Sequence, residues 1–457
     1  MKLRFYNAKI LTMQDEEIIS GELHTDGGAI TYVGAENDCG GFDREIDLSG
    51  KLIIPGFKNA HTHSAMTFLR SFADDLPLND WLYNAVFPHE AKLTEEAVYV
   101  FTQLANMEYL TSGITSSFDM YFKLDSYTKA CTDMGYRTVL CGSINDFGGT
   151  VEGIEEEYNK FNSADPLISY QLGFHAEYTT KRETLEGLAK LSQKYKAPMY
   201  AHNSETKSEV DGCRERYGMS PTQLFEKLGM LEYGGGGFHC VWFNEEDMRI
   251  AKERGLWIVT NPSSNLKLAS GIAPLCEMKR RGIDNLAIGT DGAASNNCLD
   301  MFREMFLVTA LQKYRENDAA AFPAFDVLKM ACSGGALSMG LTDCDALAPG
   351  KKADLAVIDL MQPNMQPEHN IAKNLVYAGT KQNVVMTVVD GKILYENGKF
   401  TTVDPAEIYS RAKILSEEIC KLSSGIMQNL CMVPDFYENP LSSPNCIKKG
   451  VDFSVHV

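Results

Sequence analysis

Residues 52–63 read LIIPGFKNAHTH, an apolar run that ends in two histidines, His61 and His63. Side chains two positions apart on a β-strand point to the same face, so both imidazoles can reach one metal ion at the end of the strand. A zinc-like cation takes three or four nitrogen, oxygen or sulfur ligands, so this pair supplies only half of a site. Alone, such a short motif is more often a pair of solvated or packed histidines, and the other ligands must be found downstream.

Four further apolar runs carry polar residues that could complete the site. They cover residues 167–175, 196–202, 236–242 and 285–292, and each has the length and composition of a short strand. When such strands lie parallel in a barrel, their carboxyl ends meet on one side. One pocket could therefore collect the polar residues at or near those ends, which are His175, His202, His239 and Asp291.

The segments between these runs have helical spacing, for example 182–194, 244–254 and 274–281. Alternating strands and helices predict an α/β fold, and eight strand candidates match the number that closes a (β/α)8 TIM-type barrel. A doubly wound open sheet would instead place a glycine-rich phosphate loop after its first strand. The four glycines at 234–237 precede a strand and read as a turn. The eight candidates lie near 52–59, 114–121, 138–145, 168–175, 197–203, 236–242, 257–261 and 286–291.

The two ends of the chain have a different sequence pattern from the middle, with short strands of alternating hydrophobicity and glycine turns. We predict that residues 1–54 and 347–401 together form a small β-sandwich built from both termini, and that the barrel covers 55–346. Asp404 and Pro405 have the composition of a helix start, which predicts a helix to about residue 428. That helix and an irregular tail from 431 make up residues 402–457.

Composition excludes several classes of protein. The net charge of −18 argues against binding to nucleic acid or to an anionic membrane. Residues 1–11 carry too much charge for a signal-peptide core, and no run of 18 apolar residues follows. Twelve cysteines without CxxC pairs suit reduced thiols better than a disulfide framework. We therefore expect a cytoplasmic protein without a membrane partner.

Several motifs together carry a family resemblance. They are the HTH after an apolar strand, AHNSET at 201–206, FHC at 238–240, NPSSNLKL at 261–268 and GTDGAASNN at 289–297. With the stretch 61–93, they resemble the amidohydrolase superfamily, and more narrowly its methylthioadenosine/S-adenosylhomocysteine deaminase and chlorohydrolase branch. The similarity extends from about residue 10 to 398. It implies a barrel with a small terminal domain and a metal-dependent aminohydrolase acting on C–N bonds in cyclic amidines.

The metal site that this resemblance implies has four ligands: His61, His63, His202 and Asp291. With one water they leave the open position at which a divalent metal lowers the pKa of that water toward neutrality. One metal per chain is favoured, because the strand at 138–145 offers neither a lysine nor a glutamate to bridge a second. Three imidazoles and a carboxylate suit Zn²⁺, although Fe²⁺ and Mn²⁺ would also fit.

Two residues beside these ligands are candidates for catalysis, in addition to Asp291. A deaminase must protonate a ring nitrogen during the attack, and Glu205, three residues after His202, could move that proton. The alternative is an exposed glutamate that caps the next helix. His239 could stabilise the charge that develops during the attack, or it could be a further ligand or a packed core histidine.

Substrate contacts come from position-by-position matching to the family. The matching assigns ribose-hydroxyl recognition to Glu90 and purine contact to His175, with Trp81 and Met120 as apolar walls. Each of these could equally be a packed or a solvent-facing residue. Asp74, Asp75 and Asp119 are interpreted as structural.

One departure from the family concerns the 5′ position of the substrate. Members that accept S-adenosylhomocysteine tend to carry an arginine at the end of the third strand and another after a glycine pair. Here those places hold Cys141 or Gly142, and Thr150, while Arg137 begins the strand and is expected to face elsewhere. A buried carboxylate without a cation is costly, which disfavours S-adenosylhomocysteine.

We therefore expect deamination of methylthioadenosine, 5′-deoxyadenosine or adenosine to the inosine analogue and ammonia. The first alternative is hydrolysis of another aminated or halogenated heterocycle, of the guanine, pterin or triazine type, because the ligands are the same. Glu205, His239 and Glu90 together favour the nucleoside. The second alternative is a catalytically silent binding protein, which would have little reason to keep four ligands and an acid. The expected partner is a small heterocycle, and the resemblance also suggests a homo-oligomer.

Overall fold

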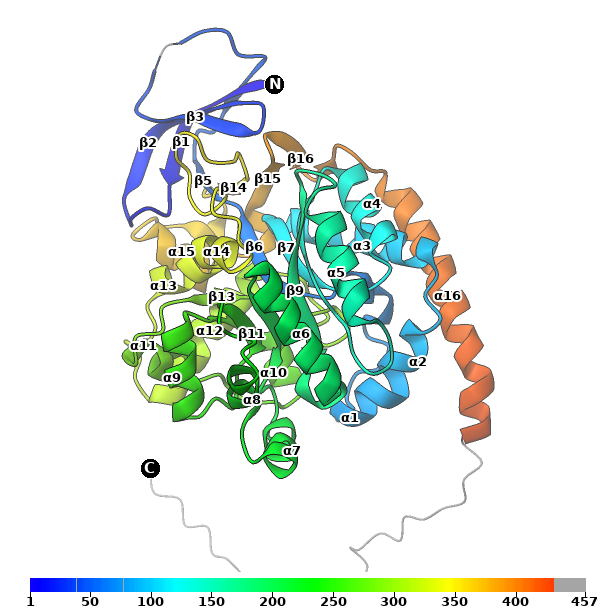
Figure 1. Cartoon of the computed structure of the whole chain (residues 1–457). Helices are drawn as coiled ribbons and strands as arrows, with labels where there is room; N and C mark the ends of the chain where they lie inside the picture. Colours follow the sequence, from blue (N-terminus) through cyan, green and yellow to red (C-terminus); the bar gives the residue numbers. More distant parts are fainter. Residues whose placement is uncertain (38, 77, 431–457) are drawn as a thin grey trace, which may run out of the picture.

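The computed structural model describes residues 1–37, 39–76 and 78–430. Its centre is a sheet of eight strands, and every neighbouring pair of strands is parallel (Figure 1). The strands follow one another in chain order, as the (β/α)8 barrel prediction requires. They are β6 (Phe57–Thr62), β7 (Ile114–Met120), β8 (Arg137–Cys141), β9 (Ile168–Ala176), β10 (Met199–Asn203), β11 (Gly235–His239), β12 (Trp257–Thr260) and β13 (Leu286–Ile288).

Helices connect successive strands and cover the outside of the barrel (Figure 1). The three helices expected from spacing are present as α6 (Arg182–Tyr195), α9 (Glu245–Arg254) and α11 (Leu275–Arg280). Their neighbours include α3 (Glu95–Thr111), α4 (Leu124–Met134), α5 (Val151–Phe161), α7 (Lys207–Tyr217), α8 (Pro221–Lys227), α10 (Pro262–Lys267) and α12 (Met301–Glu316). Side-chain caps set several starts, such as Asn244, which accepts from the backbone of Asp247.

Several strand limits differ from the sequence prediction, and two of the differences lie at glycines. The run at 52–59 is divided, because β5 (Lys51–Pro55) belongs to the terminal sheet and β6 begins the barrel. Gly56 lies at the division, where a Cβ would approach Thr115 Cγ2 to 2.1 Å. The reading of 234–237 as a turn before a strand is wrong, because β11 already begins at Gly235. A Cβ at Gly235 would lie 1.9 Å from Met199 O, so this strand approaches its neighbour too closely for a side chain.

The first and last strands of the barrel meet at a seam made largely of polar contacts. Asn59 on β6 donates from Nδ2 to Thr290 Oγ1 at 2.7 Å and accepts the backbone N–H of Thr290 at 2.8 Å. The backbone N–H of Asp291 donates to His61 O at 2.9 Å. The seam therefore brings the HTH segment and Asp291 to the same end of the barrel.

Both termini contribute to a separate small β domain, as expected. Its strands are hydrogen-bonded in one mixed sheet of nine, in which β5 pairs with both β1 and β14. This sheet has a hydrophobic core of its own, which includes Phe5, Ile10, Leu355 and Val388. The remaining strands are β1 (Lys2–Leu11), β2 (Ile18–Asp26), β3 (Ala29–Gly34), β4 (Arg44–Asp47), β14 (Leu355–Asp359), β15 (Val384–Val389), β16 (Lys392–Glu396) and β17 (Lys399–Phe400).

The C-terminal helix α16 (Pro405–Leu430) runs down the side of the barrel and packs on α3 (Figure 1). Asp404 caps it by accepting the backbone N–H of Ala406 at 2.9 Å. The tail predicted from residue 431 lies outside the described residues. Among the helices that the structure describes, none is long and apolar enough to cross a membrane. The cysteines of the described part are free thiols.

A buried ion pair joins the barrel to the terminal sheet. Arg137, the first residue of β8, donates from Nε to Asp354 Oδ2 at 2.7 Å and from Nη2 to Oδ1 at 3.2 Å. Both side chains are at most 4 % exposed. The amide of Asp390 also donates to Asp354 at 2.7 Å. Arg137 therefore faces the terminal sheet, at the end of the barrel away from the cluster of histidines.

Replacing Arg137 with methionine should leave the Asp354 carboxylate buried and unpaired. We expect the free energy of unfolding to fall by about 3–5 kcal/mol, measured as a lower urea midpoint. The control is Arg182→Met, which removes the exposed pair with Glu186 and should cost less than about 1 kcal/mol. Equal midpoints for the two variants would contradict the structural importance of the buried pair.

Candidate active site

Five polar residues converge at the carboxyl ends of the barrel strands. His61 lies on β6, His202 on β10 and His239 at the end of β11, while His63 and Asp291 follow β6 and β13. All five are buried or nearly so, and they come from segments up to 230 residues apart. The fold therefore brings together the residues that the sequence singled out as ligands.

The atoms of this cluster are spaced as ligands of one ion. The Nε2 atom of His202 lies 3.2 Å from Nε2 of His61 and 3.3 Å from Nε2 of His63. Asp291 Oδ1 lies 3.6 Å and 3.3 Å from those two atoms of His61 and His63. Zinc–ligand bonds of about 2.0–2.1 Å in a tetrahedral arrangement place neighbouring ligand atoms roughly 3.3 Å apart. The spacing of the four residues matches that arrangement.

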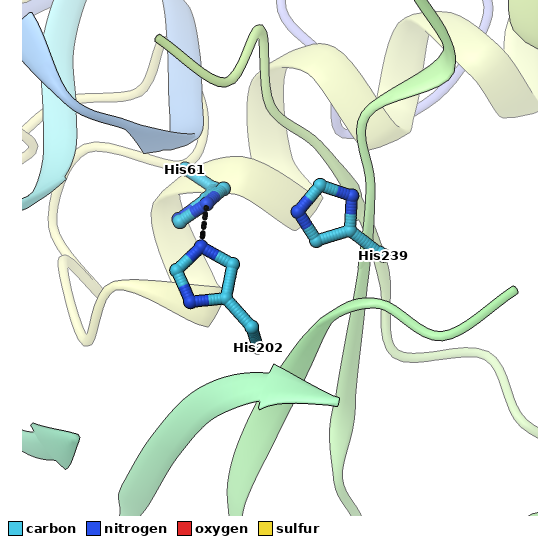
Figure 2. A group of neighbouring side chains, drawn as sticks. All are labelled: His61, His202 and His239. Atoms are coloured by element: carbon cyan, nitrogen blue, oxygen red, sulfur yellow. Dashed lines mark hydrogen bonds between the residues drawn. The ribbon is translucent and has the colours of Figure 1, made fainter. Parts of the chain in front are cut away.

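Hydrogen bonds on the far side of two rings fix which nitrogen carries the proton. His63 donates from Nδ1 to Met120 O at 2.7 Å, and His202 donates from Nδ1 to His175 O at 2.7 Å. The Nε2 lone pairs of both rings are therefore directed into the cluster. Figure 2 shows that the rings of His61, His202 and His239 face a common space. Lone pairs at these distances repel one another unless a cation lies between them.

Asp291 supplies the negative charge of the cluster and is held firmly. Its Oδ2 accepts from Ser264 Oγ at 2.6 Å and from Ser295 Oγ at 2.8 Å, and its Oδ1 accepts from the amide of Gly292 at 2.8 Å. Burial lowers the pKa of His63, but the carboxylate of Asp291 outweighs this effect and raises that pKa to about 9. A positive charge beside Asp291 is thus electrostatically favoured, and a divalent cation would take the place of this proton.

Two other imidazoles of the cluster, those of His61 and His202, are held in the neutral form. Burial, followed by the neighbouring His63, lowers the pKa of His61 well below its usual range. Burial likewise lowers the pKa of His202, with His61 as the next cause. Metal ligands must offer an unprotonated nitrogen, so both rings have the required form. The cluster fits a divalent metal ion in the number and spacing of its ligands, and the ion would displace the proton that Asp291 favours on His63.

His239 lies slightly farther out than the four residues above. Its Nδ1 donates to Asn265 Oδ1 at 2.7 Å, and its buried Nε2 has no hydrogen-bond partner among the described residues. That Nε2 is 4.0 Å from Asp291 Oδ2 and 3.9 Å from Glu205 Oε2. His61, His202 and His239 also form a possible ligand group. The longer distances favour a role beside the metal rather than a bond to it.

Glu205 is buried next to His239, so it is not the exposed helix cap that was the alternative reading. Thr206 caps α7 instead. Ser270 donates from Oγ to Glu205 Oε1 at 3.3 Å, and Oε2 is the oxygen that faces His239. Burial raises the pKa of Glu205, and the nearby His239 partly opposes this. A carboxyl with a raised pKa can both accept and return a proton near neutral pH.

A cavity of about 680 Å³ opens beside the cluster, within the range of small-molecule sites. Burial raises the pKa of Glu90 at its wall to about 7. Glu90 Oε1 and the hydroxyl of Tyr121 in this wall make no hydrogen bond of ordinary length among the described residues, although Tyr121 is close enough to lower the pKa of Glu90 in part. Burial also lowers the pKa of His175 to about 3, so this ring is neutral. The residues predicted from sequence that line the cavity are His63, Trp81, Glu90, Met120, His175, His202, Glu205, His239 and Asp291.

The cavity lining outside the cluster has little positive charge. Thr150 and the carboxylate of Glu157 belong to it, and no arginine is among the described lining residues. Its one lysine, Lys123, pairs with Glu95 at 3.4 Å. Cys141 is packed inside the barrel. Outside the cavity, Asp74 accepts from Asn297 at 2.8 Å, in agreement with a structural role.

Sequence reasoning missed several residues around the cluster. Asn265 and Ser270 hold His239 and Glu205; Asn265 lies in the NPSSNLKL motif, but its contact with His239 was not predicted, and no motif contains Ser270. The aromatic rim formed by Tyr83, Phe87 and Phe147 was also missed. Glu209 could have been found, because Thr206-x-x-Glu209 is the signature of a helix capping box.

Comparison with known proteins adds the family. The family model described as the amidohydrolase family matches residues 52–394. The chain belongs to this family. It is 37% identical to the 5-methylthioadenosine/S-adenosylhomocysteine deaminase of Thermoanaerobacter pseudethanolicus, with 89% of this chain and 97% of that protein covered. It is 36% identical to the 5′-deoxyadenosine deaminase of Methanosarcina acetivorans, with 90% and 97% covered.

A solved structure of a family relative is also similar over nearly its whole length. It is an adenosine deaminase from Xanthomonas campestris with bound zinc, 32% identical, with a TM-score of 0.87. The match covers 92% of this chain and 98% of that one. The family and the ligand geometry together indicate a divalent metal in this amidohydrolase.

Replacing one ligand should remove the metal, whereas replacing a neighbouring histidine should not. We expect His202→Asn to lose the bound metal and His175→Asn to keep one equivalent per chain, measured by elemental analysis. The two rings are only 4.8 Å apart, but only His202 directs a lone pair into the cluster. Metal retained by His202→Asn, or lost equally from both variants, would contradict the assignment of His202 as a ligand.

Proposed function

We propose that this amidohydrolase is a hydrolytic deaminase of an adenosine-like nucleoside. The observation that carries the proposal is a buried carboxyl, Glu205, in the wall shared by the ligand cluster and the cavity. Hydrolysis of this kind needs a group that moves a proton from water to the ring while remaining free of the metal. Water and the nucleoside give the inosine analogue and ammonia.

Four side chains are proposed to hold one metal ion, His61, His63, His202 and Asp291, and their donor set favours Zn²⁺. When bound, a divalent metal supplies a water of lowered pKa for attack at neutral pH. The convergent Nε2 lone pairs and the spacing near 3.3 Å support this set of ligands.

Glu205 is proposed to carry the proton at Oε2. Ser270 occupies Oε1, which leaves Oε2 toward His239 and the cavity. The carboxylate accepts a proton from the attacking water, whose oxygen bonds to the carbon, and donates that proton to the ring nitrogen. It then moves the proton of the new hydroxyl to the amino group, and the C–N bond breaks to release ammonia. The Nε2 atom of His239 lies in the same space, and the hydrogen bond to Asn265 fixes the ring. There it can stabilise negative charge on the oxygen that adds to the carbon under attack.

Nucleoside recognition is proposed for the opposite wall of the cavity. Glu90 has a buried, unpartnered oxygen that can accept a ribose hydroxyl, which would satisfy its hydrogen-bonding capacity. The neutral His175 can contact the purine, and Trp81 and Met120 offer apolar surface for the base.

The charge of the cavity favours a neutral 5′ substituent. An amino-acid carboxylate at its far end would meet Glu157 and Thr150, with no arginine among the described lining residues to pair with it. Such a charge is costly to bury. We therefore propose methylthioadenosine, 5′-deoxyadenosine or adenosine as substrate rather than S-adenosylhomocysteine.

Replacing the proton carrier should stop the reaction without removing the metal. We expect Glu205→Gln to lower kcat for ammonia release by roughly 10²- to 10⁴-fold, because glutamine cannot take up and return the proton. Elemental analysis should find the metal content unchanged. A variant with full activity would exclude Glu205 as the proton carrier.

Substrate choice can be measured as ammonia release from a panel of compounds by the metal-loaded enzyme. We expect kcat/KM for methylthioadenosine and 5′-deoxyadenosine to exceed that for S-adenosylhomocysteine by about 100-fold or more, since burying an unpaired carboxylate is costly. Guanine and melamine should release no ammonia. Equal rates with S-adenosylhomocysteine would refute the charge argument, and silence across the nucleosides would point to another heterocycle.

A further inference from the structure

The turn that carries Glu205 is held in an unfavourable backbone conformation. Ser204, between the ligand segment and Glu205, has a φ of +51°. A left-handed conformation is unfavourable for a residue with a side chain, so other contacts must stabilise it. The turn is tied to the end of β11, because Trp242 donates its amide to Ser204 O at 2.9 Å. The amide groups of the turn, those of residues 204–206, need other acceptors.

Glu209, in the first turn of α7, supplies those partners. Its Oε1 accepts the amide of Ser204 at 2.9 Å, and its Oε2 accepts the amides of Glu205 at 2.7 Å and Thr206 at 3.5 Å. The carboxylate is only 5% exposed. Three successive N–H groups around one carboxylate form a concave anion-binding arrangement, and they leave the turn little freedom.

These bonds exceed what a helix start requires. The capping box of α9 has the same plan, but there Asp247 accepts only one backbone amide outside the helix, that of Asn244 at 3.0 Å. Glu209 reaches back two residues farther, to the amides of Glu205 and Ser204. Its additional contacts therefore hold the residue that is proposed to carry the proton.

The carboxyl of Glu205 itself has only weak support. Its hydrogen bond from Ser270 is 3.3 Å long, and His239 is 3.9 Å away. The position of this carboxyl thus depends on the backbone beneath it. A shift of about 1 Å in a reacting group can cost 100-fold in rate.

We propose that Glu209 is a positioning residue, which fixes Glu205 at the distance needed for proton transfer by binding the amides of residues 204–206. The inference rests on the proposed function of Glu205. Glu209 lines neither the cavity nor the ligand cluster, and it acts through the turn alone.

The test is Glu209→Gln in the metal-loaded full chain. Glutamine offers one acceptor oxygen and turns an NH₂ group toward N–H donors, so the turn loses part of its support. We expect kcat for methylthioadenosine to fall about 10- to 100-fold, with KM and metal content unchanged. The matched control is Asp247→Asn, which weakens the other capping box and should lower stability comparably while kcat stays near the wild-type value.

A double variant separates positioning from general damage to the fold. If Glu209 acts through Glu205, adding Glu209→Gln to Glu205→Gln should lower the residual rate no further. Multiplied losses, or an unchanged kcat in the single variant, would overturn the inference. Should Glu209→Gln fail to fold, Glu209→Asp keeps the charge but shortens the reach, and it should lower kcat by the same mechanism; a wild-type kcat there would overturn the inference. Full activity of Glu205→Gln would instead refute the proposed function.

Discussion

The meeting of β6 with β13 is the constraint on which the rest of the site depends. It joins residues 59–61 to residues 290–291 through the Asn59–Thr290 pair and the bond from the Asp291 amide to His61 O. Gly289 lies at this seam, where a Cβ would be 2.7 Å from both the backbone N and O of His61. A side chain at that position would push the strands apart, and the ligand distances near 3.3 Å would be lost. Closure of the barrel and assembly of the metal site are therefore one event.

Backbone strain is concentrated at the same end of the barrel. Ser204, His239 and Asp291 have φ values of +51°, +73° and +60°, although each carries a side chain. Such conformations persist only when the surroundings over-determine them. Each strained residue here has a polar support, from Glu209, from Asn265 and from the serines around Asp291, respectively. The active end thus carries a cost in stability that the large apolar core of the barrel offsets.

Much of this structure could be predicted from sequence, because strand ends and ligand types leave local signals. The apolar runs that end in His202 and His239 predicted both the barrel and the convergence of ligands. The division at Gly56 was missed although Pro55-Gly56 is a signal for a break, because the different partners of the two halves become known only from the tertiary structure. The glycines at 235–237 resemble a turn, but they form a strand. Glycine is required at Gly235 because β10 approaches too closely for a side chain. Likewise, Asn265 and Ser270 acquire their tasks only through tertiary contacts.

The metal-ligand side of the cavity and the rest of its lining come from different structural elements. The residues proposed for the reaction are thereby separate from those proposed to choose the substrate. The ligands and His239 lie on or directly after barrel strands, where burial and hydrogen bonds fix them. The rest of the lining comes from loops, from the π-helical turn Trp81–Val86 and from α5, and its aromatic rim includes Phe147, which is 69% exposed. Under the proposed function, a change of charge at Thr150 or Glu157 would alter which 5′ substituent is tolerated without moving any ligand atom. Under the proposed function, the barrel strands therefore carry the groups that do the chemistry, and a few side chains of the loops and of α5 choose the molecule on which they act.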